Sequence, residues 1–239
     1  MSLTNKHVVV TGGNRGIGQA LVEEALRRGA KRVYAGTRQP LAHADRRVTP
    51  LTLDVTNVSQ IQRAVGALDV LINNAGVAIY DDLSNLDVIE QHLAVNFFGL
   101  LKVTHAFLPL LKRSKGAIVN NLSLAGLAAL PVIPSYSISK AAAFNLTQSL
   151  RALLASQGVS VHAVVLGPID TDMNRGFEIP KASPASAAQG IFDGLEKGED
   201  EIFPDPASLS LAEGWRAGAL KALERQFAGF VPQSVANVG

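Results

Sequence analysis

The stretch HVVVTGGNRGIG, residues 7–18, decides the fold of this 239-residue chain. His7 to Val10 predict a buried strand, four glycines follow at positions 12, 13, 16 and 18, and Gly16 to Arg28 have the apolar period of a helix. Glycines between a strand and a helix leave backbone N–H groups free to bind a diphosphate. The spacing here is Gly-x-x-x-Gly-x-Gly and not the commoner Gly-x-Gly-x-x-Gly. Two interpretations of this segment therefore stay open at this point, a diphosphate site and an ordinary tight turn.

Beyond this segment, short β-branched runs alternate with longer segments of helical period, which predicts a parallel sheet with helices on both faces. The predicted strands are 7–10, 32–35, 48–53, 69–72, 117–122, 159–165 and, last, 201–203. The predicted helices are 16–28, 58–67, 88–111, 135–156, 184–197 and 207–227. We therefore predict an α/β fold of the Rossmann type, a doubly wound parallel sheet of about seven strands in the order 3-2-1-4-5-6-7 between two helical layers.

Pro50 gives a test of this strand order. Proline cannot donate a ladder hydrogen bond, so the strand that contains it should lie at a sheet edge, where the predicted order places it. No linker, internal repeat or low-complexity tract divides the chain, so we predict one domain over residues 1–239.

Composition limits the function classes. With 47% hydrophobic and 18% charged residues the chain is globular, and its net charge of +2 comes from scattered basic groups, which argues against nucleic acid. There is no cysteine, which excludes disulfides and a thiol nucleophile. The five histidines form no ligand pair, so no metal is expected. Without a secretory pattern or an apolar run near 20 residues, we expect a soluble cytoplasmic protein that binds no membrane.

The end of the second predicted strand indicates which dinucleotide would bind. An acid that accepts from the ribose 2′-OH is expected there, but the chain has Thr37 followed by Arg38. Arg38, together with Arg15 of the glycine turn, could instead hold a 2′-phosphate through charge-assisted hydrogen bonds. The alternative is that both are ordinary surface arginines.

Polar residues also follow the third and fourth predicted strands. Asp54 either accepts a hydrogen bond from an adenine amino group or caps the next helix with Thr56 and Asn57. Residues 73–76, Asn-Asn-Ala-Gly, would let the backbone lie against a flat ligand, or they form only a tight turn. Asp81 and Asp82 adjoin each other in a predicted loop, and we interpret them as a solvated turn.

Three side chains suit proton transfer. Ser123 follows the fifth strand, and Tyr136 and Lys140 stand four residues apart on one face of the next helix. A neighbouring ammonium lowers the pKa of a tyrosine, which would make Tyr136 a general acid or base. Such a pair is common by chance. Its position gives it weight, because each of these candidate groups follows the carboxyl end of a strand, where open α/β sheets bind ligands.

As a set, these motifs resemble the short-chain dehydrogenase/reductase family in its short-subunit branch, over Lys6 to about Met173. The matching positions are Thr11 to Gly18, Asp54, Asn73 to Gly76, Asn96, Ser123, Tyr136, Lys140 and the turn Gly167-Pro168-Ile169-Asp170-Thr171. The residue before Gly167 is Leu166, where the family commonly has proline.

The resemblance implies an NADP(H)-dependent oxidoreductase, with NAD(H) as the second choice, that reduces a small ketone, aldehyde or quinone or oxidises the matching alcohol. It implies that Tyr136 transfers the proton and that Ser123 polarises the carbonyl oxygen of the substrate. Lys140 would bind the nicotinamide ribose and lower the pKa of Tyr136, and Asn96 would hold a water next to Lys140. The implied cofactor contacts are Gly12, Asn14, Arg15, Gly16, Ile17, Gly18, Arg38, Asp54, Val55, Asn74, Ala75, Gly76, Tyr136, Lys140, Ile169 and Thr171.

In the same comparison, residues 172–190 would form the substrate loop, 205–230 a carboxyl-terminal helical segment, and the protein would be a homodimer or homotetramer joined through its long helices. Substrate-pocket candidates are Val77, Leu124, Ala125, Ile133, Phe177 and Ile179, each of which is also an ordinary packing residue. An alternative function is a regulatory protein that senses NADP without turnover. A sugar-nucleotide epimerase is disfavoured, because that branch usually has Gly-x-x-Gly-x-x-Gly and a larger carboxyl-terminal region.

Overall fold

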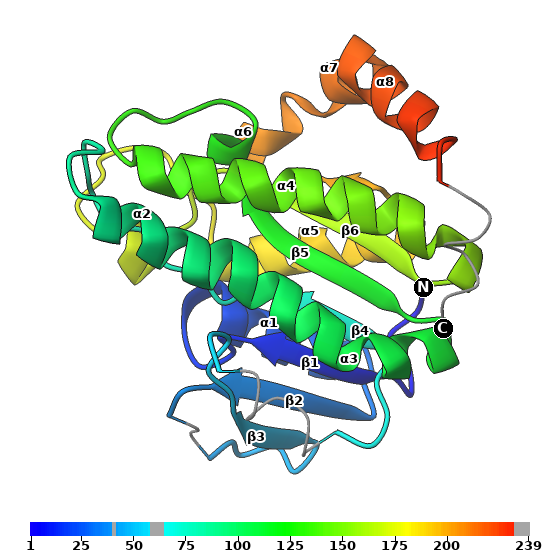
Figure 1. Cartoon of the computed structure of the whole chain (residues 1–239). Coiled ribbons are helices and arrows are strands. Elements are labelled where there is room, and N and C mark those ends of the chain that lie inside the picture. Colours follow the sequence, from blue (N-terminus) through cyan, green and yellow to red (C-terminus); the bar gives the residue numbers. More distant parts are fainter. Residues whose placement is uncertain (40–41, 58–64, 232–239) are drawn as a thin grey trace.

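A computed structural model describes residues 1–39, 42–57 and 65–231 and contains one parallel sheet (Figure 1). Its strands run in the order β3-β2-β1-β4-β5-β6-β7, which confirms the predicted α/β fold. Their bounds are β1 (His7–Thr11), β2 (Arg32–Thr37), β3 (Val48–Thr52), β4 (Val70–Asn73), β5 (Ala117–Ser123), β6 (Ser160–Leu166) and β7 (Glu201–Ile202). Pro50 lies in β3 at one end of this order, so the predicted edge position is also confirmed.

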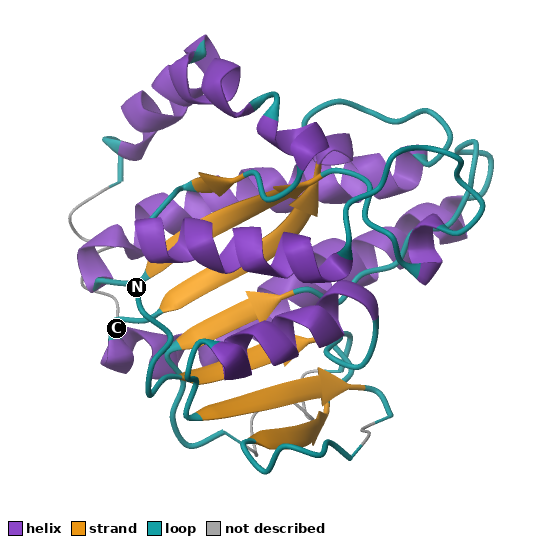
Figure 2. Ribbon diagram, turned by 180° about the vertical axis from the view of Figure 1, so that it is seen from behind, coloured by secondary structure: helices purple, strands orange, loops and turns teal. Residues whose placement is uncertain are grey.

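Helices cover both faces of the sheet, which is easiest to follow in Figure 2. On one face, α1 (Gly16–Arg27) and α5 (Pro184–Lys197) pack side by side and bury Leu21 and Ile191 against the sheet. On the other face lie α3 (Leu100–Ser114) and α4 (Pro134–Leu154), with Phe107 in the core. Short 3₁₀ turns lie at Leu124–Gly126, Ala155–Gln157 and Asp172–Asn174. Most of the predicted helix 58–67 falls outside the described residues.

The predicted helix 88–111 needs correction. The helical run begins earlier, at α2 (Leu86–His92), continues as a π-helical segment (Leu93–Gly99) and ends with α3. A π-helical stretch accommodates an extra residue in a helix and is frequent at functional sites. Here it surrounds Asn96, whose side chain is 2% exposed and is tied to the loop after β4.

By length and composition alone, the run Leu86–Ser114 is apolar enough to cross a membrane. In the structure, however, Val103, Phe107 and Leu111 of this run are 0–2% exposed and pack in the core between helix and sheet. This is the burial expected of a core helix in a three-layer α/β fold.

The predicted helix 207–227 is also wrong, because the chain forms three short helices there. They are α6 (Pro206–Leu209), α7 (Ala212–Ala217) and α8 (Ala219–Ala228). Gly218 has extended backbone angles, φ −75° and ψ 157°, which separate α7 from α8. Asp205 starts α6 through a capping box with Ser208, and its carboxylate also accepts the N–H of Gly167 at 2.8 Å. The segment is therefore shaped by tertiary contacts and not by helical period.

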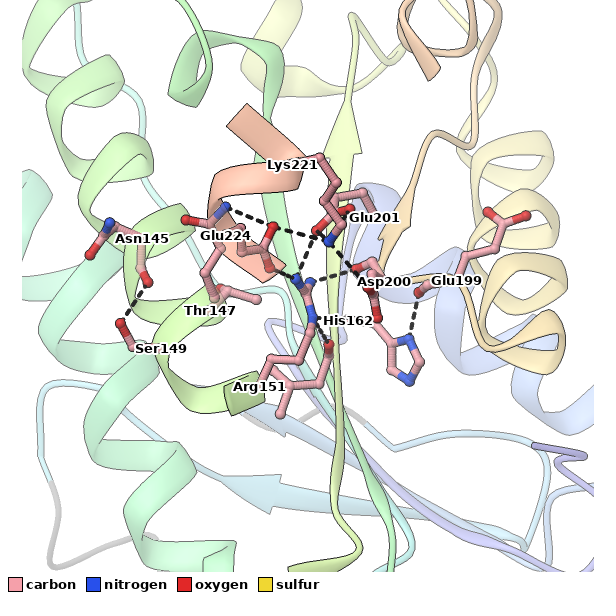
Figure 3. A network of polar contacts seen from close by, with 12 residues as sticks. Asn145, Thr147, Ser149, Arg151, His162, Glu199, Asp200, Glu201, Lys221 and Glu224 are labelled. Carbon is pink, nitrogen blue, oxygen red and sulfur yellow. Dashed lines mark hydrogen bonds and ion pairs between the residues drawn. The ribbon is translucent and has the colours of Figure 1, made fainter. Parts of the chain in front are cut away.

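Charged side chains attach α8 to the rest of the molecule (Figure 3). Lys221 lies 2.9 Å from Glu201 of β7 and 3.0 Å from Glu224, and its side chain is 2% exposed. Arg151 of α4 reaches Glu201 at 2.8 Å and also pairs with Glu224. A buried charge is tolerated only when it is paired. The packing of α8 therefore depends on this ion cluster.

Removing one member of the cluster tests this dependence. We expect Lys221→Met to lower the free energy of unfolding by about 3 kcal/mol, because Glu201 keeps its buried charge and loses a partner. The control is Arg216→Met, since Arg216 pairs at 3.2 Å with Glu199 in an exposed position, where such a pair contributes less than about 1 kcal/mol. Urea unfolding of both variants measures the difference. Equal, small losses would show that the cluster does not stabilise the fold.

Candidate active site

The glycine turn between β1 and α1 has the conformation that its sequence requires. Gly12 and Gly16 have positive φ angles of 68° and 52°, which other residues adopt at a cost. A Cβ placed on Gly18 would lie 1.9 Å from the carbonyl oxygen of Gly12, so only glycine fits there. Among the described residues no side chain caps the start of α1, although Asn14 and Arg15 lie exposed beside it. The N–H groups at this helix end are thus available to an anion.

The end of β2 lies next to this turn. The N–H of Gly12 donates to Gly36 at 2.7 Å, and Thr37 and Arg38 follow directly. The Thr37 hydroxyl is buried and has no hydrogen-bond partner among the described residues. Arg38 and Arg15 are exposed, and within 1–39, 42–57 and 65–231 neither is recorded in an ion pair. The structure therefore places two cations and one unused hydroxyl where an adenosine ribose is expected.

Asp54 and Val55 lie just after β3. The Asp54 carboxylate accepts hydrogen bonds from the N–H of Thr56 at 2.9 Å and from its hydroxyl at 2.6 Å, which closes a local turn. These bonds, with a smaller contribution from the charge of Arg38, lower the pKa of Asp54. Val55 is buried and packs against Gly99 at the end of the π-helical segment.

Hydrogen bonds connect the carboxyl ends of β1, β4 and β5. The Thr11 hydroxyl accepts from the N–H groups of Asn74 at 2.9 Å and Ala75 at 3.0 Å. The Asn74 amide donates to the carbonyl of Thr11 at 3.0 Å and accepts from the Asn121 amide at 2.8 Å. Residues far apart in the sequence are in this way held at one edge of the sheet.

The turn after β6 reaches the same edge from the other side. A Cβ placed on Gly16 would lie 3.2 Å from Cγ2 of Thr171, so the glycine turn and this turn are neighbours. Ile169 is 3% exposed and pairs with Ala182 across the substrate loop. The contact between Gly167 and Asp205 holds the turn in place even though Leu166 stands where a proline was expected.

Tyr136 lies in the first turn of α4, near enough to Ser123 at the end of β5 for the serine hydroxyl to affect the pKa of its phenol. Lys140 lies one turn further along, 6% exposed, and its ammonium donates to the carbonyl of Asn121 at 2.8 Å. The Lys140 nitrogen is 5.6 Å from the centroid of the Tyr136 ring. The three residues predicted to transfer protons are therefore brought together.

The sequence led us to expect that Lys140 lowers the pKa of Tyr136, but in the structure this pKa is raised. Burial raises the pKa of Tyr136, and the hydrogen bond with Ser123 offsets only part of that increase. Burial also lowers the pKa of Lys140 to about 8. Both groups are shifted toward their neutral forms, because a buried charge loses its hydration.

Asn96 is held next to Lys140 by the loop after β4. Its amide oxygen accepts from the N–H of Val77 at 2.9 Å, and its amide nitrogen donates to the Val77 carbonyl and to Ser139, each at 2.9 Å. A Cβ placed on Gly76 would lie 3.2 Å from the Asn96 amide oxygen and 3.8 Å from the Lys140 nitrogen. The water implied by the resemblance stays a prediction.

Three residues near Tyr136 were not predicted from the sequence. His92 is completely buried, and its ring lies edge-on to that of Tyr136 with centroids 6.3 Å apart. The interpretation of Asp81 as part of a solvated turn is wrong, because its carboxylate binds the buried Ser135 at the start of α4. Tyr80 stacks on Phe177 of the substrate loop at 5.7 Å. A buried histidine in an apolar helix was the one signal in the sequence. The Asp81 contact joins segments 54 residues apart, so no local pattern reveals it.

The proposed pocket residues are distributed around this centre. Phe177 and Ile179 lie in the substrate loop, and a cavity of about 290 Å³ opens below it, lined by Asp170, Thr171, Asp172, Arg175, Gly176 and Lys181. Val77 is next to Asn96, and Ile133 directly precedes α4. Ala125 is 8% exposed and Leu124 packs against the core, so these two serve packing at least in part.

Comparison with known proteins assigns this arrangement to a family. The sequence profile described as short chain dehydrogenase matches residues 6–181. The 2-(S)-hydroxypropyl-CoM dehydrogenase 3 of Xanthobacter autotrophicus is 34% identical over 210 residues, 79% of this chain and 82% of that protein. An uncharacterized oxidoreductase of Staphylococcus aureus is 32% identical over 214 residues, 81% of this chain and 92% of that protein.

Among solved structures, a short chain dehydrogenase from Burkholderia cenocepacia in complex with NADP is 38% identical, with a TM-score of 0.84. The alignment covers 95% of this chain and 99% of that one. The similarity therefore extends through the substrate loop and the carboxyl-terminal helices, beyond the part that the sequence profile matches.

The lowered pKa of Lys140 predicts how stability depends on pH. Between pH 8 and 10.5 the unfolded chain keeps the lysine proton and the folded chain does not, so stability rises with pH in that window. Lys140→Met removes this gain. We expect its free energy of unfolding, relative to the unmodified chain, to fall by about 2 kcal/mol from pH 7.5 to 10. Urea unfolding at several pH values measures it, and a difference independent of pH would contradict the assignment.

Proposed function

This chain belongs to the short-chain dehydrogenase family and is an oxidoreductase of the CH–OH/C=O class, and on this premise we propose that it reduces a small carbonyl with NADPH, with Tyr136 as the proton donor. The carbonyl is a ketone, an aldehyde or a quinone, and the matching alcohol is the substrate of the reverse reaction. The observation that carries the proposal is the convergence of Ser123, Tyr136 and Lys140 with the glycine turn at one sheet edge.

The residues at this edge fit a dinucleotide. The space that a Cβ would occupy at Gly12 and Gly18 is already taken by backbone and by Asn74, so the backbone presents a smooth surface to a diphosphate. Asn14, Arg15 and Ile17 lie in the same turn. Asn74, Ala75 and Gly76 would face the riboses, and Ile169 and Thr171 would face the nicotinamide. The bound cofactor supplies the hydride, or accepts it in the reverse reaction.

We assign the preference for NADP(H) to Arg38 and Arg15. A 2′-phosphate needs cations, and both guanidinium groups are exposed beside the end of β2. The solved relative from Burkholderia, 38% identical, contains NADP, which supports this preference. An acid at position 37 or 38 would have favoured NAD(H), which remains the second choice.

The proton steps follow from the environments of the three side chains. A tyrosine phenol holds its proton at neutral pH, and burial, which raises the pKa of Tyr136, keeps it in that form. The phenol can then donate this proton to a carbonyl oxygen, although the raised pKa makes it a weaker acid. The Ser123 hydroxyl lies near the Tyr136 phenol and would donate to the same oxygen, which would stabilise the negative charge that develops there. Lys140, held by Asn121, would orient a ribose hydroxyl next to Tyr136 and stabilise its phenolate after proton transfer.

The residues at the entrance of the site favour a substrate with an apolar group. Tyr80 and Phe177 stack across the gap between the loop after β4 and the substrate loop, with an angle of 21° between the rings. Ile179 and Met173 of the substrate loop are half exposed, 47% and 46%. Rings and aliphatic groups at the entrance contribute binding energy to apolar substrates without a charge requirement.

A sensor that binds NADP without turnover is the alternative function. Such a protein needs only the glycine turn, whereas this chain also has Ser123, Tyr136 and Lys140 close together at the same edge of the sheet. The enzyme is therefore favoured.

We also propose that it acts in the cytoplasm as a homodimer or homotetramer, supported by the exposed Phe98 and Ile138 on the long helices. Light scattering tests the assembly, and a strict monomer would contradict it.

Replacement of the proton donor tests the mechanism. We expect Tyr136→Phe to lower kcat about 10³-fold, in the range of general acid catalysis, and to leave the Kd for NADPH within twofold. The measurement is cofactor absorbance during turnover of a panel of aldehydes, ketones, quinones and alcohols. Tyr34→Phe, in β2 and buried in the core, is the control and keeps full activity. Undiminished turnover by Tyr136→Phe would refute the assignment, and no turnover by the unmodified chain on any panel member would favour the sensor.

Reversal of one charge tests the cofactor preference. We expect Arg38→Asp to raise the Kd for NADPH about 100-fold, because a charge-assisted pair is lost and a repulsion is introduced. The Kd for NADH should change little. Lys31→Asp makes a similar charge reversal just before β2, at the opposite end of the same strand, and should affect neither cofactor. Fluorescence titration gives the constants, and equal affinity of the unmodified chain for both cofactors would contradict the preference.

A further inference from the structure

Asp81 connects the loop after β4 to the start of α4. One carboxylate oxygen accepts the hydroxyl of Ser135, and the other accepts the Ser135 N–H at 3.4 Å. Ser135 is completely buried and lies in the first turn of the helix, where N–H groups have no partner within the helix. A carboxylate at this end is also favoured by the helix dipole. Asp81 is therefore a cap supplied from 54 residues away in the sequence.

Tyr136 is the next residue after Ser135, so this contact fixes the turn that carries the proton donor. On its other side the Tyr136 ring meets His92 edge-on. The His92 ring is fixed at both nitrogens, because Nδ1 donates to the carbonyl of Val88 at 2.8 Å and Nε2 accepts from the N–H of Ile79 at 3.0 Å. Ile79 belongs to the same loop as Asp81. The loop after β4 therefore positions Tyr136 through two contacts, one with Ser135 and one with His92.

The neighbouring carboxylate shows that this contact is specific. Asp82 is exposed, and its carboxylate contacts Ser84, two residues further along the same loop. Asp81 makes a similar local contact with the N–H of Leu83 at 3.4 Å, but it also reaches Ser135 of α4. Leu83, which follows, has a positive φ of 67°, a costly conformation for a leucine. Backbone of this kind persists only where the surroundings hold it. The Asp81 carboxylate supplies part of that support, because it accepts the Leu83 N–H at 3.4 Å while it also binds Ser135 of α4.

We propose that Asp81 is a positioning residue for Tyr136: its carboxylate, through Ser135, holds the first turn of α4 so that the phenol stays against Ser123 and the substrate oxygen. The proposal rests on the proposed function for its kinetic consequence, but not for the contact itself. Loss of the carboxylate releases the turn. A displacement of about 1 Å of a catalytic group is enough to reduce kcat about 100-fold. Cofactor binding should change little, because the glycine turn has its own contacts.

The experiment compares Asp81→Ala with Asp81→Asn and with the matched control Asp82→Ala. We expect kcat to fall 10- to 100-fold in Asp81→Ala, with the Kd for NADPH within twofold. Asp81→Asn keeps an oxygen that accepts the Ser135 hydroxyl and should retain at least half of kcat, while Asp82→Ala should retain all of it. A fall in kcat of similar size in Asp82→Ala, or no fall in Asp81→Ala, would overturn the proposal.

A spectroscopic readout separates this proposal from the proposed function. Phenolate absorbance, taken as the difference from the Tyr136→Phe chain, reports the pKa of Tyr136 alone. In Asp81→Ala the released turn admits water, so this pKa should fall toward its ordinary value, and in Asp82→Ala it should not move. If the unmodified chain turns over no substrate, the proposed function fails while this titration still decides on Asp81. Ser135→Ala, which removes only a hydroxyl, should shift the titration in the same direction and covers the case in which Asp81→Ala does not fold. An unshifted titration in the folded variants would overturn the proposal.

Discussion

The parallel direction of β1, β4, β5 and β6 is the constraint on which the rest of the structure depends. In a parallel sheet all strands end at the same edge, so the residues that follow them meet there. The site is built from these ends: the glycine turn follows β1, Asn74 to Gly76 follow β4, Ser123 ends β5 and Thr171 follows β6. Hydrogen bonds such as those of Thr11 with Asn74 and Ala75 then set the spacing between the segments.

Burial at this edge of the sheet favours the neutral forms of the ionisable side chains. Lys140 and Tyr136 lose hydration, and both pKa values move toward the neutral forms, to about 8 for the lysine. The environment therefore keeps the Tyr136 phenol protonated beside Ser123, as a proton donor requires. The cost in stability at neutral pH comes from Lys140, because its ammonium is buried. Active sites commonly contain such shifted groups, because the shift is part of the chemistry.

The carboxyl-terminal segment and the loop after β4 show a different use of polar contacts. In α8 the charged face is turned inward to Glu201 and Arg151, while Leu220, Leu223 and Phe227 are 40–68% exposed. In the loop, Asp81 and Ile79 bind α4 and His92. The loop and α8 are attached by these polar groups, whereas α7 also packs Trp215 against Phe144 of α4. The period of their sequences therefore carries little information about their structure.

From the sequence alone, the strand order, the edge position of Pro50 and the residues that gather at the sheet edge could be predicted, because β-branched runs, glycine spacing and strand ends are local signals. The family resemblance supplied the roles of those residues, which stay proposals. Four features could not be predicted. They are the π-helical segment around Asn96, the break of the last helix at Gly218, the attachment of Ser135 to Asp81 and the direction of the shift in the pKa of Tyr136. Each is decided only in the tertiary structure, because hydrogen-bond partners and burial come from residues distant in the chain.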